Sequence, residues 1–166
     1  MPDTTNVFSK VFFVKNINET KTIAQRFAKL VLEKAKKFNN GTFVCLFGDI
    51  GAGKTAFSRF VASEIGVKEK ITSPSFVILN EYHSGKIPFY HFDLYRLETV
   101  GVKSITDELQ QYSEGKILTF VEWAEFLQKQ IPFDRIEIDI KYETENARTF
   151  TFKGYGETNN CLIKEL

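Results

Sequence analysis

The sequence of 166 residues lacks several features that mark specialised classes of protein. It has only two cysteines, Cys45 and Cys161, and their spacing indicates neither a disulfide framework nor a zinc site. It has no apolar run of the roughly 18–20 residues that a membrane span requires. Asp3 and Asn6 interrupt any early apolar segment of the kind found in signal peptides. We therefore expect a cytoplasmic protein that works in a reducing environment.

An excess of charge of one sign is also missing. The 22 Lys and Arg residues nearly balance the 21 Asp and Glu residues, which gives a formal net charge of +1. A domain that binds nucleic acid by itself usually carries a clear basic stripe. The short, interrupted lysine clusters within 34–37 and 68–70 are more typical of solvated helix ends and loops. If RNA matters to this protein, we expect another protein to hold it.

What remains is the composition of an ordinary globular protein, with 43% hydrophobic and 26% charged residues. The chain has no repeat and no linker-like stretch, so we predict a single domain over residues 1–166, in which 1–9 are loose. An apolar run at 42–47, bounded by glycines, predicts a strand buried on both faces, as in parallel sheets. Helical spacing of apolar residues predicts a helix that is capped by Asn18 and ends near Phe38.

The second half of the chain is predicted to be rich in strands. Runs at 76–82 and 87–92 are separated by four residues and are typical of a β-hairpin, and 116–121 predicts another buried strand. A helix is expected around 103–112. Apolar and charged residues alternate within 136–152, which indicates antiparallel strands with one wet face at the edge of the sheet.

The segment from Gly48 to Thr55, GDIGAGKT, matches the phosphate-binding pattern G-x-x-x-x-G-K-[ST] in full. Its glycines allow the backbone to curl so that N–H groups point at phosphate oxygens, and the following helix adds its positive N-terminal end. Lys54 supplies an ammonium group to the β- and γ-phosphates, and the Thr55 hydroxyl can ligate Mg²⁺. The segment follows a predicted buried strand and precedes a predicted helix, as this chemistry requires.

We therefore predict that the chain binds ATP or another nucleoside triphosphate together with Mg²⁺. The predicted fold is an α/β, three-layer P-loop NTPase with a mixed, mostly parallel central sheet and an antiparallel edge. The predicted nucleotide-binding residues of the loop are Gly48, Asp49, Gly51, Ala52, Gly53, Lys54, Thr55 and Ala56.

A second acid for the metal is expected at the end of a strand beside the loop strand. Glu122 ends the apolar run 117–121, and Asp93 ends the shorter run 90–92. The run before Glu122 is typical of a more deeply buried strand, so we assign Glu122 to the metal. Asp93 is then expected to hold the attacking water or a metal-bound water. Either acid alone is also compatible with a surface or capping role. With Lys54, the two acids form the predicted catalytic set.

Other polar residues near these motifs allow two interpretations each. The hydroxyl-rich segment 72–76 lies where many such enzymes sense the γ-phosphate, and an ordinary turn explains it equally well. His91 could carry a proton, but its alternation with Asp93 more simply places both on one face of a strand. Trp123 fits either the core or the nucleotide site, and Arg96 fits either a phosphate or the surface.

Four segments in series resemble the bacterial TsaE (YjeE) family of ATPases. They are 48–55, 72–76, the sequence HFDLYR at 91–96, and the sequence VEW at 121–123. Their order and spacing match over about residues 11–155. Ser75 stands where the family more often has threonine, and the hydroxyl is kept.

The resemblance implies a role in tRNA modification. It implies an ATPase that supports the formation of threonylcarbamoyladenosine beside the anticodon, in a complex with TsaD, which transfers the threonylcarbamoyl group, and TsaB. The tRNA would be held by the partners. The resemblance also implies that Thr22 and Glu125 lie near the nucleotide and that Arg148 can reach its base or ribose.

Three alternatives remain open. A small-molecule or nucleotide kinase shares the loop but usually has an arginine-bearing lid, and the four arginines after Thr55 form no clustered pair. A GTPase is disfavoured because the chain has no Asn-Lys-x-Asp segment that reads guanine. A nucleotide-gated binding module with negligible catalysis is the third.

Overall fold

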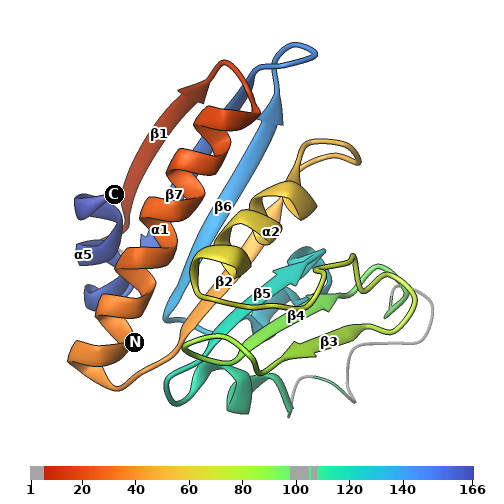
Figure 1. Ribbon diagram of the computed structural model, residues 1–166. Helices are drawn as coiled ribbons and strands as arrows, with labels where there is room; N and C mark the ends of the chain where they lie inside the picture. Colours follow the sequence, from red (N-terminus) through yellow and green to blue (C-terminus); the bar gives the residue numbers. More distant parts are fainter. Residues whose placement is uncertain (1–5, 98–104, 106–107) are drawn as a thin grey trace.

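The computed structural model describes residues 6–97, 105 and 108–166 (Figure 1). In chain order, its strands (β), α-helices (α) and 3₁₀ helices (η) are β1 (Phe8–Val14), α1 (Ile17–Phe38), β2 (Thr42–Phe47), α2 (Lys54–Glu64), β3 (Leu79–Tyr82), β4 (Phe89–Asp93), η1 (Gln110–Ser113), β5 (Leu118–Glu122), η2 (Ala124–Gln130), β6 (Arg135–Tyr142), β7 (Arg148–Tyr155) and α5 (Glu157–Glu165). None of the helices in these ranges combines the length and apolarity that crossing a bilayer requires.

The strands form one seven-stranded sheet in the order β1-β7-β6-β2-β5-β4-β3. The four central strands, β6, β2, β5 and β4, are parallel neighbours. Antiparallel pairing occurs toward both edges, between β1, β7 and β6 on one side and between β3 and β4 on the other. The predicted α/β class with a mixed sheet is thus confirmed. β6 was expected in an antiparallel edge. It does pair antiparallel with β7, but on its other side it pairs in parallel with the central strand β2.

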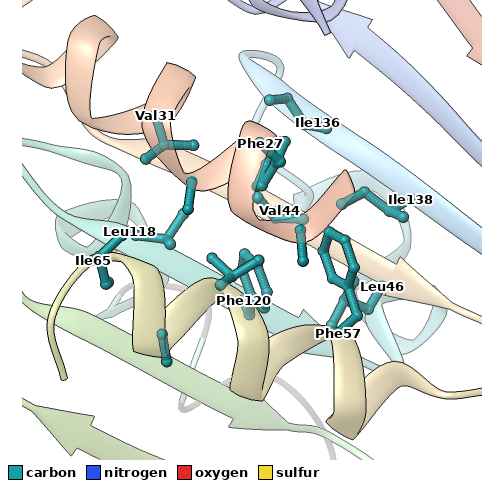
Figure 2. Packing of buried hydrophobic residues seen from close by; sticks show 14 of the residues in the cluster. Phe27, Val31, Val44, Leu46, Phe57, Ile65, Leu118, Phe120, Ile136 and Ile138 are labelled. Atoms are coloured by element: carbon teal, nitrogen blue, oxygen red, sulfur yellow. The ribbon is translucent and has the colours of Figure 1, made fainter. Parts of the chain in front are cut away.

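Two apolar clusters cover the two faces of the sheet, which explains why β2 is buried on both. Helices α1, α2 and α5 pack on one face. On this face the ring centres of Phe27, Phe57 and Phe120 lie 5.9–6.5 Å apart (Figure 2). On the other face, Phe43 and Cys45 of β2 pack in a second cluster with residues of η2. The fold therefore has three layers: the α-helices, the sheet, and a thin layer of 3₁₀ helices on the opposite face.

Several boundaries differ from the predictions for local reasons. The N-cap of α1 is Asn16 and not Asn18, because the Asn16 side chain accepts hydrogen bonds from the N–H groups of Asn18 and Glu19. Phe8 and Ser9, expected to be loose, belong to β1, which pairs with β7. The helix expected at 103–112 lies partly outside the described residues, and 110–113 form the 3₁₀ helix η1.

Helix α5 was not predicted from the sequence. It packs on β7, β1 and α1, and this close approach requires glycine at position 154. A Cβ atom there would lie 2.8 Å from the backbone of Asn159. The Asn160 side chain then accepts a hydrogen bond from the N–H of Phe8 at 2.8 Å, so α5 fastens the first strand to the sheet.

Lys34 of α1 is buried where α1, β2 and α5 meet. Its ammonium group donates to the carbonyl of Gly41, to Oγ1 of Thr42 and to Oδ1 of Asn159 at 2.9, 3.2 and 2.9 Å. Burial lowers the pKa of Lys34 from 10.5 to about 8, although the Coulomb attraction of Asp134 acts in the opposite direction. The hydrogen-bond acceptors around the lysine are neutral, so its positive charge lowers the stability of the folded protein.

A pH dependence of stability follows from this shift. Since the folded-state pKa lies below the unfolded one, the cost of charging Lys34 is fully present below pH 8 and disappears as the pH rises toward 10.5. The free energy of unfolding should rise by about 1 kcal/mol from pH 7 to pH 9 relative to Lys34→Met. Urea unfolding of both proteins measures this difference. Burial also raises the pKa of Cys45 to about 12, which lowers the stability of both proteins above pH 9 and so cancels in their difference. Parallel curves would contradict the prediction.

Candidate functional site

The loop 48–53 joins the end of β2 to the start of α2, at the carboxyl end of the central parallel strands. Gly51 and Gly53 have φ angles of 82° and 109°, a region that strongly favours glycine, and Gly53 is the residue at which α2 is capped. At Gly48, a Cβ atom would lie 2.7 Å from the carbonyl oxygen of Ile140 on β6. The glycines of the motif therefore allow the chain to turn tightly over the N-terminus of α2.

Lys54, the first residue of α2, folds back over this loop. Its ammonium group donates to the carbonyl oxygens of Gly48 and Asp49 at 2.5 and 3.2 Å, and it lies 6.0 Å from the centre of the Trp123 ring. The side chain is largely buried. A positive charge is thus held at the loop, where the helix N-terminus also favours an anion.

The two predicted acids lie side by side at the ends of neighbouring strands. β5 is next to β2, and Glu122 pairs in register with Leu46, so Glu122 ends the strand beside the loop strand. Asp93 pairs directly with Glu122 across β4 and β5, which places both side chains on one face of the sheet. Both are buried. The strand order places Glu122 nearer the loop strand than Asp93.

The loop, helix α2 and the two acids surround a hollow of about 500 Å³, which we call the larger hollow to distinguish it from a smaller one of about 180 Å³ on the other side of the loop. This volume lies within the range of small-molecule binding sites. Its walls come from the loop, from the segment 73–75, and from the ends of β4 and β5. The described residues that line it are Ile50, Gly51, Gly53, Lys54, Thr55, Ala56, Ser73, Ser75, Asp93, Tyr95, Glu122 and Trp123.

The hydroxyl-rich segment 72–76 is connected to Asp93. The Ser75 hydroxyl donates to Oδ2 of Asp93 at 2.9 Å, and Oγ of Ser73 lies 2.7 Å from Oγ of Ser75. The second carboxylate oxygen of Asp93 accepts from the N–H of Tyr95 at 3.0 Å. The segment is therefore a wall of the larger hollow. The strand expected from residue 76 begins only at Leu79, because 75–77 form a turn.

Arg148, at the start of β7, contacts the loop from the opposite side. Its Nε donates to the carbonyl oxygen of Ala52 at 2.9 Å, and its Nη1 donates to that of Thr144 at 2.7 Å. The guanidinium group also lies 4.5 Å from the centre of the Tyr142 ring. Arg148 lines a second, smaller hollow of about 180 Å³, together with Thr20, Gly53 and Ala56. The loop thus separates two hollows.

Two residues that the family resemblance places near the nucleotide, Thr22 and Glu125, lie outside both hollows. Thr22 is on the exposed face of α1, where its hydroxyl donates to the carbonyl of Asn18, and Glu125 is exposed in η2. Neither is among the described residues that line the hollows. The buried Thr20, which sequence reasoning missed, lines the smaller hollow. It is a polar residue on the apolar face of α1 that also carries Ala24 and Phe27, and this pattern could have revealed it.

The donors of the larger hollow suit Mg²⁺ held jointly with phosphate. Within the described ranges, no group of three or more His, Cys, Asp and Glu side chains could hold a metal ion unaided. Thr55 and Glu122 provide a hydroxyl and a carboxylate beside the phosphate-binding loop. Mg²⁺ is commonly bound by one or two protein oxygens with substrate phosphates and water. The two residues therefore fit the predicted ion.

The parallel strands, the complete phosphate-binding loop and the helix that follows it define a P-loop NTPase fold. The sequence profile of the family described as threonylcarbamoyl adenosine biosynthesis protein TsaE matches residues 14–150, and the chain belongs to this family. The resemblance inferred from four short motifs is thereby confirmed.

Individual relatives agree with this assignment. The TsaE protein of Bacillus subtilis is 38% identical over 151 residues, which are 91% of this chain and 89% of the relative. The TsaE protein of Synechocystis is 39% identical over 131 residues, 76% of this chain and 77% of the relative. The crystal structure of YdiB from B. subtilis superimposes with a TM-score of 0.74 at 31% identity, covering 98% of this chain and 96% of that one.

Proposed function

We propose that this chain is a Mg²⁺-dependent ATPase that supports the threonylcarbamoyladenosine modification of tRNA in a complex with TsaD and TsaB. Membership of the TsaE family supports the pathway. The observation that carries the ATPase activity is the convergence of Lys54, Thr55, Asp93 and Glu122 on the larger hollow. A phosphate-binding loop beside one acid that can hold Mg²⁺ and a second that can orient water suits hydrolysis of a nucleoside triphosphate.

The proposed reaction is an in-line attack of water on the γ-phosphorus, in which a P–O bond to water forms while the bond to the bridging oxygen breaks, so that ADP and inorganic phosphate leave with the proton released by the water. Lys54 and the N–H groups of the loop stabilise the negative charge that spreads over the phosphate oxygens. Mg²⁺, held by Thr55 and Glu122, would neutralise charge on the phosphates. Asp93 orients the attacking water. Because Ser75 donates to Asp93 in this structure, that hydroxyl must share or give up its place when the water binds.

We place the triphosphate in the larger hollow and the nucleoside toward the smaller one. This orientation is supported by the polar side chains of Thr20 and Arg148, which line the smaller hollow on the other side of the loop. It keeps the base and ribose away from Asp93 and Glu122, which serve the phosphates.

Two features favour slow hydrolysis by the isolated chain and acceleration by partners. The described lining of the larger hollow includes a lysine but no arginine, so an arginine finger would have to come from elsewhere. Two large apolar side chains at the site are exposed: Ile50 of the loop is 92% exposed, and Phe76 of the segment 72–76 is 80% exposed. Exposed apolar groups at a site are typical of surfaces that a partner covers.

The test is to measure ATP hydrolysis by the purified chain alone and with TsaD and TsaB, and to assay threonylcarbamoyladenosine in tRNA. We expect slow hydrolysis alone, acceleration by the two partners, and modification that requires both ATP and this chain. Fast turnover that the partners do not change would contradict the proposal. Transfer of phosphate to a small acceptor would instead support a kinase.

Replacing Arg148 should test whether it acts on the loop or on the base. Because its guanidinium group holds the carbonyl of Ala52, Arg148→Ala should weaken binding of both ATP and inorganic triphosphate about tenfold. The single tryptophan, Trp123, lies in the larger hollow and provides a fluorescence signal for both titrations. Arg26→Ala is the matched control, because Arg26 also donates to a backbone carbonyl of a residue distant in sequence, that of Glu165, and is not among the described residues that line either hollow. This variant should bind both ligands like the wild-type protein. Weaker binding of ATP alone would favour a contact with the base or ribose.

A further inference from the structure

His91 of β4 is a buried histidine whose contact with Glu122 has no assigned role. We infer that His91 is a positioning residue, whose imidazole group fixes the Glu122 carboxylate in the orientation that metal binding requires. The inference rests on the proposed function, in which Glu122 holds Mg²⁺. It concerns a residue that acts through another and does not itself touch the nucleotide.

The contact is short and fully enclosed. The Nε2 atom of His91 lies 3.0 Å from Oε1 of Glu122, and the His91 side chain is 0% exposed. In the inferred arrangement Glu122 is a carboxylate, which can only accept a hydrogen bond, so Nε2 of His91 would carry the hydrogen and donate it. Asp93 is the direct partner of Glu122 in the sheet, and His91 lies two residues before Asp93 on the same strand. The side chains of His91 and Glu122 therefore point to the same face of the sheet.

The rest of the imidazole ring makes apolar contacts. It stacks on Phe89 with a centre-to-centre distance of 5.9 Å, and its Nδ1 atom has no hydrogen-bond partner among the described residues. A buried polar atom without a partner is costly, and a phenylalanine would fill the same space without that cost. Among the described residues, the contact with Glu122 is therefore the polar interaction that a histidine, and not a phenylalanine, can provide at this position.

The contact also determines which oxygen of Glu122 is available. With Oε1 engaged by His91, the carboxylate cannot rotate without breaking a buried hydrogen bond. Its second oxygen, Oε2, is thereby left for a ligand in the larger hollow that Glu122 lines. His91 itself is not among the described lining residues. Outer residues of this kind commonly contribute about 10–100-fold to the affinity for the metal.

The test compares His91→Leu, which removes the donor, with His91→Gln, whose amide can restore it. Binding of Mn²⁺ in the presence of a non-hydrolysable ATP analogue is measured by electron paramagnetic resonance. Nucleotide binding without metal is measured separately by Trp123 fluorescence. We expect His91→Leu to weaken Mn²⁺ binding at least about tenfold and to leave metal-free nucleotide binding unchanged. We expect His91→Gln to recover most of the lost Mn²⁺ affinity.

The other histidine of the chain provides a matched control. Nε2 of His83 lies 3.3 Å from Oε2 of Glu81, but both side chains are exposed and neither is among the described residues that line the larger hollow. His83→Leu should therefore bind Mn²⁺ like the wild-type protein. Wild-type affinity in His91→Leu, or equal losses in His91→Leu and His91→Gln, would overturn the inference. Failure of the wild-type protein to bind ATP, or unchanged Mn²⁺ binding in Glu122→Gln, would instead refute the proposed function on which it rests.

A measurement on the wild-type protein does not depend on how the variants fold. Nuclear magnetic resonance of ¹⁵N-labelled imidazole groups distinguishes the two tautomers of each histidine. We expect His91 to carry its hydrogen on Nε2 and its signal to move when Mg²⁺ and the ATP analogue are added together. The signal of His83 should stay in place. A hydrogen on Nδ1 of His91 in place of Nε2 would overturn the inference.

Discussion

Lys54→Ala is expected to abolish tight binding of ATP. In the structure the Lys54 ammonium group lies against the loop, bound to the carbonyl oxygens of Gly48 and Asp49. Triphosphate oxygens in the larger hollow would be stronger partners for it than these neutral carbonyls. Loss of two or more charge-assisted hydrogen bonds, each contributing about 1.5–3 kcal/mol, should weaken binding at least about a hundredfold. Isothermal titration calorimetry with ATP and Mg²⁺ measures the loss directly.

Two controls separate the phosphate contact from damage to the fold. Lys68→Ala removes an exposed lysine and should bind ATP like the wild-type protein. Thr55→Ala should reduce the dependence of binding on Mg²⁺ while keeping affinity for the nucleotide alone, because Thr55 is proposed to bind the metal and not the phosphates. Thermal unfolding of Lys54→Ala without nucleotide should stay close to that of the wild type. ATP binding retained by Lys54→Ala would contradict the proposed site.

The phosphate-binding loop could be predicted from the sequence because its chemistry is local. Eight consecutive residues provide the turn, the ammonium group and the hydroxyl, and the flanking strand and helix are visible as apolar patterns. The position of Glu122 beside the loop strand was also accessible. A strand that is apolar on both faces belongs in the centre of a parallel sheet, and β5 lies there next to β2.

Contacts between distant segments could not be predicted in this way. The hydrogen bond from Arg148 to Ala52 spans 96 positions, and it depends on the register of β7 with β6. The bond from Ser75 to Asp93 depends on where the turn before β3 ends. Helix α5 lacks a strong pattern, and its position depends on the close approach that Gly154 allows. In each case the sequence indicates the residue type, but the tertiary contacts determine its partner.

The two hollows give the loop a double role in the proposed enzyme. On one side its residues line the larger hollow with Asp93 and Glu122, and on the other its backbone is held by Arg148. Asp93 is in turn held by Ser75, a residue of the segment whose exposed Phe76 lies beside Arg96, with 4.9 Å between the guanidinium carbon and the ring centre. A partner that contacts this segment could therefore alter the Ser75–Asp93 contact, and with it the rate of hydrolysis.

Asp93→Asn should spare ATP binding and remove most of the hydrolysis. The amide is the same size as the carboxylate and can still accept the hydrogen bond from the N–H of Tyr95. It lacks the negative charge and the second accepting oxygen that the proposed mechanism uses to orient water for attack. A positioned catalytic group of this kind contributes about 10²–10⁴-fold to the rate. Single-turnover hydrolysis in the presence of TsaD and TsaB should fall by a factor in that range, while the dissociation constant for ATP stays the same.

Ser75→Ala is the informative companion variant to Asp93→Asn. It removes the hydroxyl that occupies Oδ2 of Asp93 but keeps the carboxylate, so hydrolysis should change far less than in Asp93→Asn. An equal loss in the two variants would show that the Ser75–Asp93 contact, and not the carboxylate alone, is required for hydrolysis. Equal losses of binding and hydrolysis in Asp93→Asn would show that Asp93 serves the nucleotide or the metal, because a residue that only orients water cannot affect the affinity for ATP.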